Sequence, residues 1–385
     1  MKIKYLGFLT IALIACDSDS ETTKQPLAVG ELATIEPGGD TICSRGTPYR
    51  FFAVGGDTKR LVLDFQGGGA CWNELTCGIE DGIFAAAAPT TEQFANLGTA
   101  PDLGGIYKDD AANPLQGWTL VHIPYCTGDV HWGQATKVYN DELTIEHRGL
   151  DNVEAVLAWT KERYPSPDVI FVTGCSAGAY GAIGHATRIA RTWPKAEVRV
   201  LADSGAGIIT DSFYQQSFPN WNAEPALPLD LPALEGKGVL DLTIVELYLA
   251  VAAAYPNMRI GQYNTAFDRD QSFYYSAMGG TDPWADRLRA TVTAIAAEAP
   301  NFRHYLAPGP VHCIHPYRIF YERGEGGLEL DYATWVDEFI NGATLPDSVL
   351  CTPEGCLSDP VCDACKSAVT SDLVCRWCTE WNAAD

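Results

Sequence analysis

The sequence is poor in basic residues. It has 26 lysines and arginines against 49 acidic residues, which gives a formal net charge of −23. A surface of this sign repels the phosphates of nucleic acids and of anionic membranes. We therefore expect neither nucleic acid nor an anionic membrane surface as a partner.

Long apolar runs are also scarce, and the one that resembles a targeting signal lies at the N-terminus. Lys2 and Lys4 precede an apolar stretch over residues 5–15, which ends at Cys16. This order resembles a bacterial lipoprotein signal, in which the cysteine carries the lipid; an ordinary cleaved signal peptide is the alternative. No other stretch approaches the ~18 apolar residues of a spanning helix. The sequence predicts a protein that is exported and then either secreted or held at a bacterial membrane through lipid on Cys16 alone.

Cysteine is abundant, and its distribution fits export. Setting Cys16 aside, 13 − 1 = 12 cysteines remain, an even number that indicates disulfides in an exported chain. The tail contains two C-x-x-C pairs, which in a cytosolic protein would suggest zinc, but it has no histidine. We expect disulfides there, and neither a metal nor a cofactor in the protein. The tail cysteines are Cys351, Cys356, Cys362, Cys365, Cys375 and Cys378.

The chain length and the order of predicted elements indicate one large α/β domain with a small appendage. Expected strands alternate with expected helices, a pattern typical of a mostly parallel sheet with helices on both faces. We divide the sequence into a lipoprotein-type signal (1–16), a polar tether (17–35), a large α/β domain (36–346) and a cysteine-rich tail (347–385).

One segment carries a recognisable catalytic pattern. A run of β-branched and aromatic residues, 169–173, leads directly into Gly174-Cys175-Ser176-Ala177-Gly178, and a helix-compatible stretch follows. In the G-x-S-x-G elbow the glycines allow a strained strand-to-helix turn that exposes the serine hydroxyl. Ser176 is therefore the expected nucleophile. The N–H of Ala177 is the expected first donor to the oxyanion.

A serine nucleophile needs a base and an acid that orients the base, and in such folds they follow the serine in the order acid, then histidine. His312 lies on the loop after the last expected strand, with His315 as its competitor. Asp268 follows the second expected strand after the elbow and is the expected acid. Asp203 lies at the end of the first expected strand after the elbow and remains an alternative acid.

A glycine run follows an early strand, where these enzymes place a second oxyanion donor. It comprises Gly67, Gly68 and Gly69, and we expect the N–H groups of Gly68 and Gly69 to donate to the oxyanion. A tight turn without function is the alternative. A short disulfide between Cys71 and Cys77 would hold this loop.

Five ordered segments between about residues 40 and 345 resemble the pectin acetylesterase family. The resemblance implies an α/β-hydrolase fold, ester hydrolysis, and Asp268 rather than Asp203 as the acid. It also suggests a disulfide between Cys43 and Cys126. The segments are Gly67 to Cys71, Tyr125-Cys126 through Gly133, Gly174 to Gly178, Asp268 to Gln271, and His312-Cys313. The sequence departs from the family at Gln66, Ala70 and Ala179.

The resemblance implies a serine carboxylesterase that removes acetyl groups from a polysaccharide such as pectin. The net charge opposes a polyanionic substrate unless local cations such as Arg269 offset it, so a neutral polysaccharide or a lipid or small-molecule ester stays open. The alternative function, outside the enzymes, is that of an inactive cell-surface binding protein. The acyl group, the leaving group and the oligomeric state are not fixed by the sequence.

Overall fold

The computed structural model describes residues 24–79, 82–322, 330–367, 373–379 and 381. Within these residues the strands form a nine-stranded sheet in the order β1-β2-β4-β3-β7-β8-β9-β10-β11, and a separate two-stranded hairpin, β5-β6. The strands are β1 Leu32–Ile35, β2 Phe51–Val54, β3 Asp57–Phe65, β4 Trp118–Ile123, β5 Ala135–Asn140, β6 Leu143–His147, β7 Val169–Cys175, β8 Glu197–Asp203, β9 Arg259–Thr265, β10 Phe302–Ala307 and β11 Val349–Leu350.

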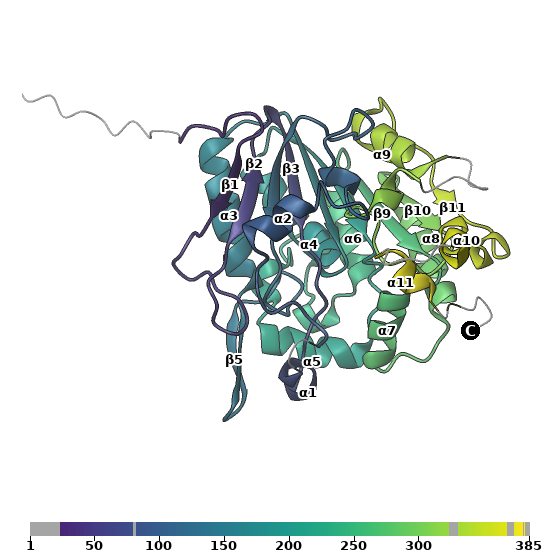
Figure 1. Cartoon of the computed structure of the whole chain (residues 1–385). Coiled ribbons are helices and arrows are strands. Elements are labelled where there is room, and N and C mark those ends of the chain that lie inside the picture. The colour runs from purple at the N-terminus through teal and green to yellow at the C-terminus, as the bar shows by residue number, and fades with distance from the viewer. Residues whose placement is uncertain (1–23, 80–81, 323–329, 368–372, 380, 382–385) are drawn as a thin grey trace, which may run out of the picture.

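Helices lie on both sides of the sheet, which is parallel from β4 to β11 and antiparallel at β1 and β2 (Figure 1). The sequence analysis predicted this α/β class, and the structure confirms it. The helices are α1 Glu74–Gly78, α2 Thr91–Asn96, α3 Gly149–Arg163, α4 Ala177–Thr192, α5 Asp211–Trp221, α6 Ile244–Ala254, α7 Arg269–Ala277, α8 Trp284–Glu298, α9 Tyr332–Asn341, α10 Pro360–Ser367 and α11 Cys375–Cys378.

Alternate residues of the central strands supply two separate cores. Leu61, Leu63 and Phe65 of β3 pack in the core that contains residues of α3, α4 and α6. Val62, between them, packs with residues of α9 on the opposite face. Because successive strand side chains point to opposite faces, strands buried on both sides read as continuous apolar runs. This explains why β7 was recognisable in the sequence.

The N-terminal tether is shorter than predicted. Residues 32–35, assigned to the tether, form β1 and pair antiparallel with β2. The side chains of β1 alternate only between exposed and half-buried, because β1 is an edge strand. A short edge strand therefore lacks the apolar pattern that marks an interior strand. The predicted signal segment and Cys16 lie outside the described residues.

The cysteine-rich tail joins the main body. β11 extends the sheet by pairing parallel with β10. The sequence had suggested that β10 is the last strand, and this expectation is wrong. All six tail cysteines form disulfides, which confirms the prediction of disulfides in the tail. The pairs are Cys351–Cys356, Cys362–Cys378 and Cys365–Cys375.

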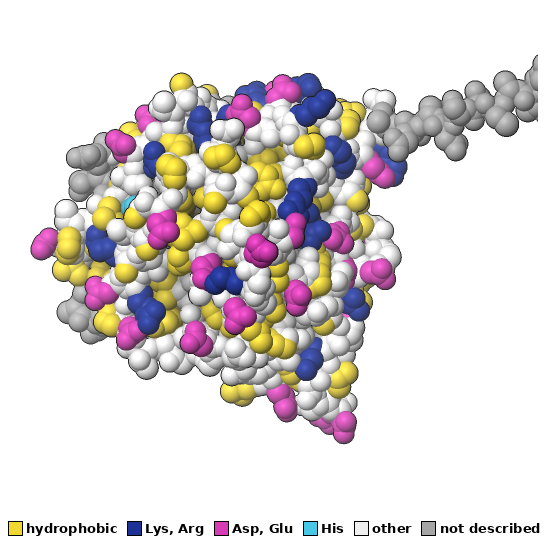
Figure 2. All heavy atoms as spheres, turned by 180° about the vertical axis from the view of Figure 1, so that it is seen from behind, with side chains coloured by type: hydrophobic (Ala, Val, Ile, Leu, Met, Phe, Trp, Pro, Cys, Tyr) yellow, Lys and Arg dark blue, Asp and Glu magenta, His cyan; other side chains and the backbone are white. Residues whose placement is uncertain are grey.

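The strong net negative charge does not gather into one patch on the face shown in Figure 2. There, acidic side chains are interspersed with lysines and arginines. Within the described residues, the helices are all too short or too polar to cross a lipid bilayer.

Candidate active site

The candidate site lies where the parallel strands end. The glycine loop follows β3, Ser176 follows β7, and Asp268 and His312 follow β9 and β10. Ligand sites of open α/β sheets lie at this carboxyl edge. The parallel order of the strands therefore brings together segments that are far apart in the sequence.

Ser176 sits in the backbone conformation expected of a nucleophile elbow. It caps α4 with φ 57° and ψ −121°, a left-handed φ that is uncommon for a residue with a side chain. The flanking glycines are required by close packing: a Cβ on Gly174 would lie 2.4 Å from the carbonyl oxygen of Gly178, and a Cβ on Gly178 would lie 1.9 Å from that of Phe65. The N–H of Ser176 donates to the carbonyl of Asp203 at 2.8 Å, which fixes the turn against β8.

His312 and Asp268 form a buried pair. Nδ1 of His312 lies 2.9 Å from each carboxylate oxygen of Asp268. The same carboxylate accepts hydrogen bonds from the backbone N–H and the side-chain amide of Gln271, both at 2.9 Å. The Gln271 amide nitrogen also donates to Asn264, and its oxygen accepts the N–H of Ala206. These bonds fix the carboxylate, and the carboxylate in turn orients the imidazole.

Electrostatics favour the protonated form of His312. Burial opposes its positive charge, but the adjacent Asp268 carboxylate outweighs burial through charge and hydrogen bonding, and raises the pKa of His312 to about 9. This carboxylate would therefore stabilise an imidazolium formed when the histidine accepts a proton.

The two alternative residues from the sequence have other partners. His315 Nδ1 lies 2.8 Å from the Thr173 hydroxyl and its Nε2 lies 2.7 Å from the Tyr332 hydroxyl, so both nitrogens are engaged in the core. Asp203 accepts the backbone N–H groups of Ile314 and His315 at 2.9 and 2.8 Å. Asp203 thus holds the loop that carries His312, while Asp268 contacts the imidazole itself.

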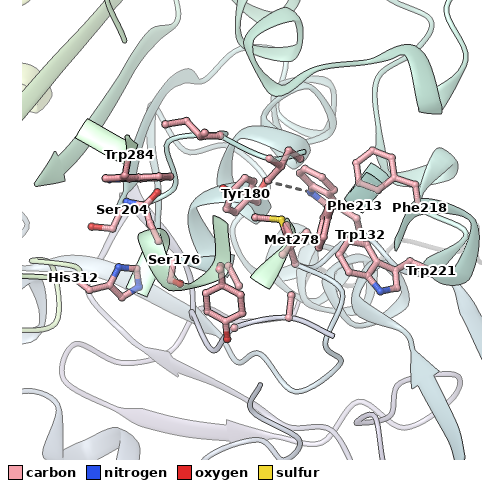
Figure 3. Close-up of a pocket in the computed structure, with 18 residues that line it drawn as sticks. Trp132, Ser176, Tyr180, Ser204, Phe213, Phe218, Trp221, Met278, Trp284 and His312 are labelled. Carbon is pink, nitrogen blue, oxygen red and sulfur yellow. Dashed lines mark hydrogen bonds between the residues drawn. The ribbon is translucent and has the colours of Figure 1, made fainter. Parts of the chain in front are cut away.

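Ser176 and His312 share the walls of two adjoining cavities. Figure 3 shows the imidazole of His312 beside the hydroxyl of Ser176, although no hydrogen bond between these two described residues is present. In enzymes without bound substrate such bonds are often long and tighten only in the complex. The arrangement can therefore pass the serine proton to His312 once a substrate is bound.

The two cavities differ in size and lining. One, of about 60 Å³, is walled mainly by apolar and aromatic side chains, among them Trp132, Phe213, Trp221, Met278 and Trp284 (Figure 3). Phe213 and Trp221 come from α5, inside the Pro- and aromatic-rich stretch that the sequence suggested as an insertion over the site. The other cavity, of about 550 Å³, has a more polar lining that includes Asp64, His122, Asp270 and Arg376.

Comparisons with known proteins place the chain near one family. A family model described as Pectinacetylesterase matches residues 32–220. The chain resembles the pectinacetylesterase family over this segment. The matched segment holds the glycine loop and Ser176 and ends before Asp268 and His312, so it does not itself assign those two residues.

Two curated relatives are similar over part of the chain. Pectin acetylesterase 11 of Arabidopsis thaliana is 27% identical over 171 residues, 43% of this chain and 42% of the relative. The palmitoleoyl-protein carboxylesterase NOTUM of Homo sapiens is 26% identical over 171 residues, 42% of this chain and 34% of the relative. The chain thus aligns with less than half the length of each.

A solved structure shows the fold. The Wnt deacylase Notum from Drosophila superposes with a TM-score of 0.60 at 16% identity, and covers 83% of this chain and 96% of that one. At this identity the likeness establishes the architecture alone.

The glycine loop lies directly against the elbow. A Cβ on Gly67 would lie 2.4 Å from the carbonyl oxygen of Cys175 and 3.0 Å from the Cβ of Ser176. Gly68 and Gly69 have φ of 155° and 75°, and their N–H groups make no hydrogen bond to other described residues. Ala177 is the first residue of α4, where helix N–H groups lack partners inside the helix. These three donors are available to an oxyanion.

All three positions that depart from the family pattern have a visible structural setting. The side-chain oxygen of Gln66 accepts the backbone N–H of Tyr125 at 3.2 Å. Ala179 lies so close to Gly205 that a Cβ on Gly205 would be 2.3 Å from that of Ala179. Ala70 lines the apolar cavity.

Disulfides join the segments around the site. Cys43 is bonded to Cys126, and Cys71 to Cys77. A third bond, Cys175–Cys313, had not been foreseen. The G-C-S and H-C neighbours were visible in the sequence, but the pairing depends on how the loop after β10 folds back to the elbow after β7. Because these cysteines are oxidised, the groups Cys71, Cys77, His147 and Cys175, His312, Cys313 offer no free thiolates to a metal.

Proposed function

We propose that the protein is a serine carboxylesterase that acts through Ser176, His312 and Asp268. The observation that carries the proposal is the buried His312–Asp268 pair, whose histidine lines the same cavity as a serine on a strained elbow. The match of residues 32–220 to the Pectinacetylesterase model supports the reaction class. The names of the curated relatives describe esterases, and we extend this reaction class to the present chain.

The first chemical step is acylation. His312 takes the proton of Ser176 as its oxygen attacks the ester carbonyl, and Asp268 stabilises the imidazolium. The N–H groups of Gly68, Gly69 and Ala177 receive the oxyanion, and a single such donor is typically worth ~3 kcal/mol of transition-state stabilisation. His312 then protonates the departing alcohol. Water, activated by the same histidine, releases the acid from the acyl-serine.

The two cavities suggest how an ester would be placed. The scissile bond must lie at Ser176, which lines both cavities. The small apolar cavity suits a short acyl group, and the large polar cavity suits a bulky hydroxylated alcohol such as a sugar chain. We therefore favour an acetylated polysaccharide as the substrate.

A second candidate follows from the aromatic walls of the small cavity. Rings such as Phe213, Phe218 and Trp221 would also pack against a longer aliphatic acyl chain. A series of p-nitrophenyl esters of increasing acyl length separates the two candidates: acetate turned over best supports the first, and long-chain esters turned over best support the second.

The proposed reaction is tested with the variant Ser176→Ala. It should abolish p-nitrophenyl acetate turnover while thermal unfolding stays close to that of the wild type. Acetate release from acetylated pectin, xylan and chitin would then identify the leaving group. A binding protein without activity would show no turnover in the wild type either, and would fail to react with a fluorophosphonate probe.

We further propose export, with lipid on Cys16 as the membrane attachment. Metabolic labelling with a fatty-acid analogue tests this: the wild type should be labelled and Cys16→Ser should not. Recovery of an unlabelled protein with a different N-terminus would instead indicate ordinary secretion.

A further inference from the structure

Helix α11 of the cysteine-rich tail lies against the proposed base. Trp377 is buried, with 3% of its surface exposed, and its ring centroid lies 6.4 Å from that of His312 at an interplanar angle of 62°. The same indole meets Tyr317, on the loop after His312, at 5.3 Å and 77°. Edge-on contacts of this kind favour one relative orientation of the rings.

The tail also contacts the residues on both sides of the proposed acid. Arg269, which follows Asp268, donates to the carbonyl oxygens of Arg376 at 3.3 Å and Thr379 at 2.8 Å. Phe267, which precedes Asp268, meets the ring of Trp381 at 6.1 Å. The tail therefore touches the segments that hold both members of the His312–Asp268 pair.

This contact is made by a cross-linked element. Two disulfides, Cys362–Cys378 and Cys365–Cys375, tie α11 to α10. Val374 and Trp377 belong to the same apolar core as residues of β10 and α9. A helix of four residues is not stable alone, so the disulfides and the core fix its position.

We propose that the tail completes the active site and that Trp377 is a positioning residue for His312. The inference rests on the proposed function. The indole covers one side of the imidazole, restricts its rotation and keeps water from the His312–Asp268 hydrogen bonds. A base held in this way meets the serine proton in one geometry, and a misplacement of ~1 Å can cost ~10²-fold in rate. The tail is then part of the catalytic domain rather than an independent binding module.

The test compares Trp377→Ala with Trp377→Phe. Fluorophosphonate titration counts the competent sites, so that kcat is expressed per reactive serine. We expect Trp377→Ala to lower this kcat about 10- to 100-fold with little change in KM, and Trp377→Phe to recover most of it. If the alanine variant does not fold, Trp377→Leu replaces it, because leucine keeps the apolar bulk. The kcat of Trp377→Leu should lie between those of Trp377→Ala and Trp377→Phe.

The matched control is Val374→Ala, which weakens the same tail but leaves the indole beside His312. It should lower the unfolding temperature without lowering kcat per titrated site. The proposal is wrong if Val374→Ala reduces kcat as much as Trp377→Ala does, or if Trp377→Ala changes only the number of titratable sites.

A second readout does not depend on activity. The proton between His312 Nδ1 and Asp268 should give a far-downfield NMR resonance that Asp268→Asn removes. We expect Trp377→Ala to broaden this resonance through exchange with water, and Trp377→Phe and Val374→Ala to retain it. An unchanged resonance in Trp377→Ala overturns the positioning role. A wild type without a reactive Ser176 overturns the proposed function instead.

Discussion

Cys175, which precedes the proposed nucleophile, is bonded to Cys313, which follows the proposed base, with their Cα atoms 5.7 Å apart. The bond joins positions 138 residues apart. Cys175 ends β7 and Cys313 lies on the loop after β10, and β8 and β9 lie between these two strands in the sheet. The loop of His312 is thus fastened covalently to the elbow of Ser176, in addition to the hydrogen bonds from Asp203.

The first prediction concerns this bond. The double variant Cys175→Ser, Cys313→Ser should lower both kcat and the unfolding temperature, because it frees the loop that carries His312. In the chain-entropy model a closed loop of this length contributes up to ~5 kcal/mol to stability. Kinetics per titrated site and thermal unfolding measure the two effects. The matched control is Cys351→Ser, Cys356→Ser, whose short loop lies outside both cavity walls and should leave kcat unchanged.

The second prediction separates two disulfides by their roles. Cys43–Cys126 spans 83 positions, and its loss should cost up to ~4 kcal/mol of stability with a modest change in the activity of folded protein. Cys71–Cys77 spans 6 positions and follows the glycine loop, so Cys71→Ser should lower kcat more than stability. Non-reducing peptide mapping of the exported protein checks the pairing. Free thiols at Cys43 or Cys126 would reject the first bridge.

The third prediction is a pH dependence with a defined sign. His312 must be neutral to accept a proton, and Asp268 raises its pKa to about 9. The acidic limb of kcat/KM should therefore lie above the ordinary histidine pKa of ~6.5. Because the folded-state pKa is raised, the pair's contribution to stability is complete below ~6.5 and is lost as the pH rises towards 9.

This prediction is checked by measuring rate and thermal unfolding across the same pH range. Asp268→Asn removes the carboxylate, so the limb of its residual activity should move to lower pH. A wild-type limb at or below the ordinary histidine value would contradict the assignment of His312 and Asp268 as a pair.

The fourth prediction concerns Arg376, a cation in the lining of the large cavity. Its guanidinium stacks on Trp377 at 4.1 Å and donates to the Tyr317 hydroxyl at 3.4 Å, and the residue is exposed. Arg376→Gln should raise KM for acetyl esters of anionic alcohols and leave that for neutral ones unchanged. Lys366→Gln removes a tail cation paired with Asp363, outside the cavity lining, and serves as the control. Equal effects of both variants would show that only overall charge matters.

Much of the fold and of the candidate site was predictable because it depends on local patterns. The interior strand β7 and the glycines around Ser176 are required by close packing, and that requirement is written in adjacent residues. The order of acid and histidine followed from the parallel sheet. Position alone left Asp203 and Asp268 both open, since they lie at the ends of neighbouring strands, and the family resemblance favoured Asp268. Their side-chain contacts differ, because Asp203 accepts from the loop backbone whereas Asp268 contacts His312.

What the sequence did not reveal depends on contacts between distant segments. β1 lacks an apolar face because it lies at the sheet edge. The Cys175–Cys313 bond requires the loop after β10 to fold back over the elbow. The place of Trp377 follows from the tail's packing on β10 and α9, which its cysteine spacing does not encode.

The most direct test of the proposed mechanism is to locate the acyl group. Protein mixed rapidly with p-nitrophenyl acetate and quenched in acid is digested and analysed by mass spectrometry. We expect one acetyl group per chain on Ser176, a stoichiometric burst of p-nitrophenolate, and neither signal in Ser176→Ala. An acetyl group on another residue, or turnover that persists in Ser176→Ala, would contradict the proposed mechanism.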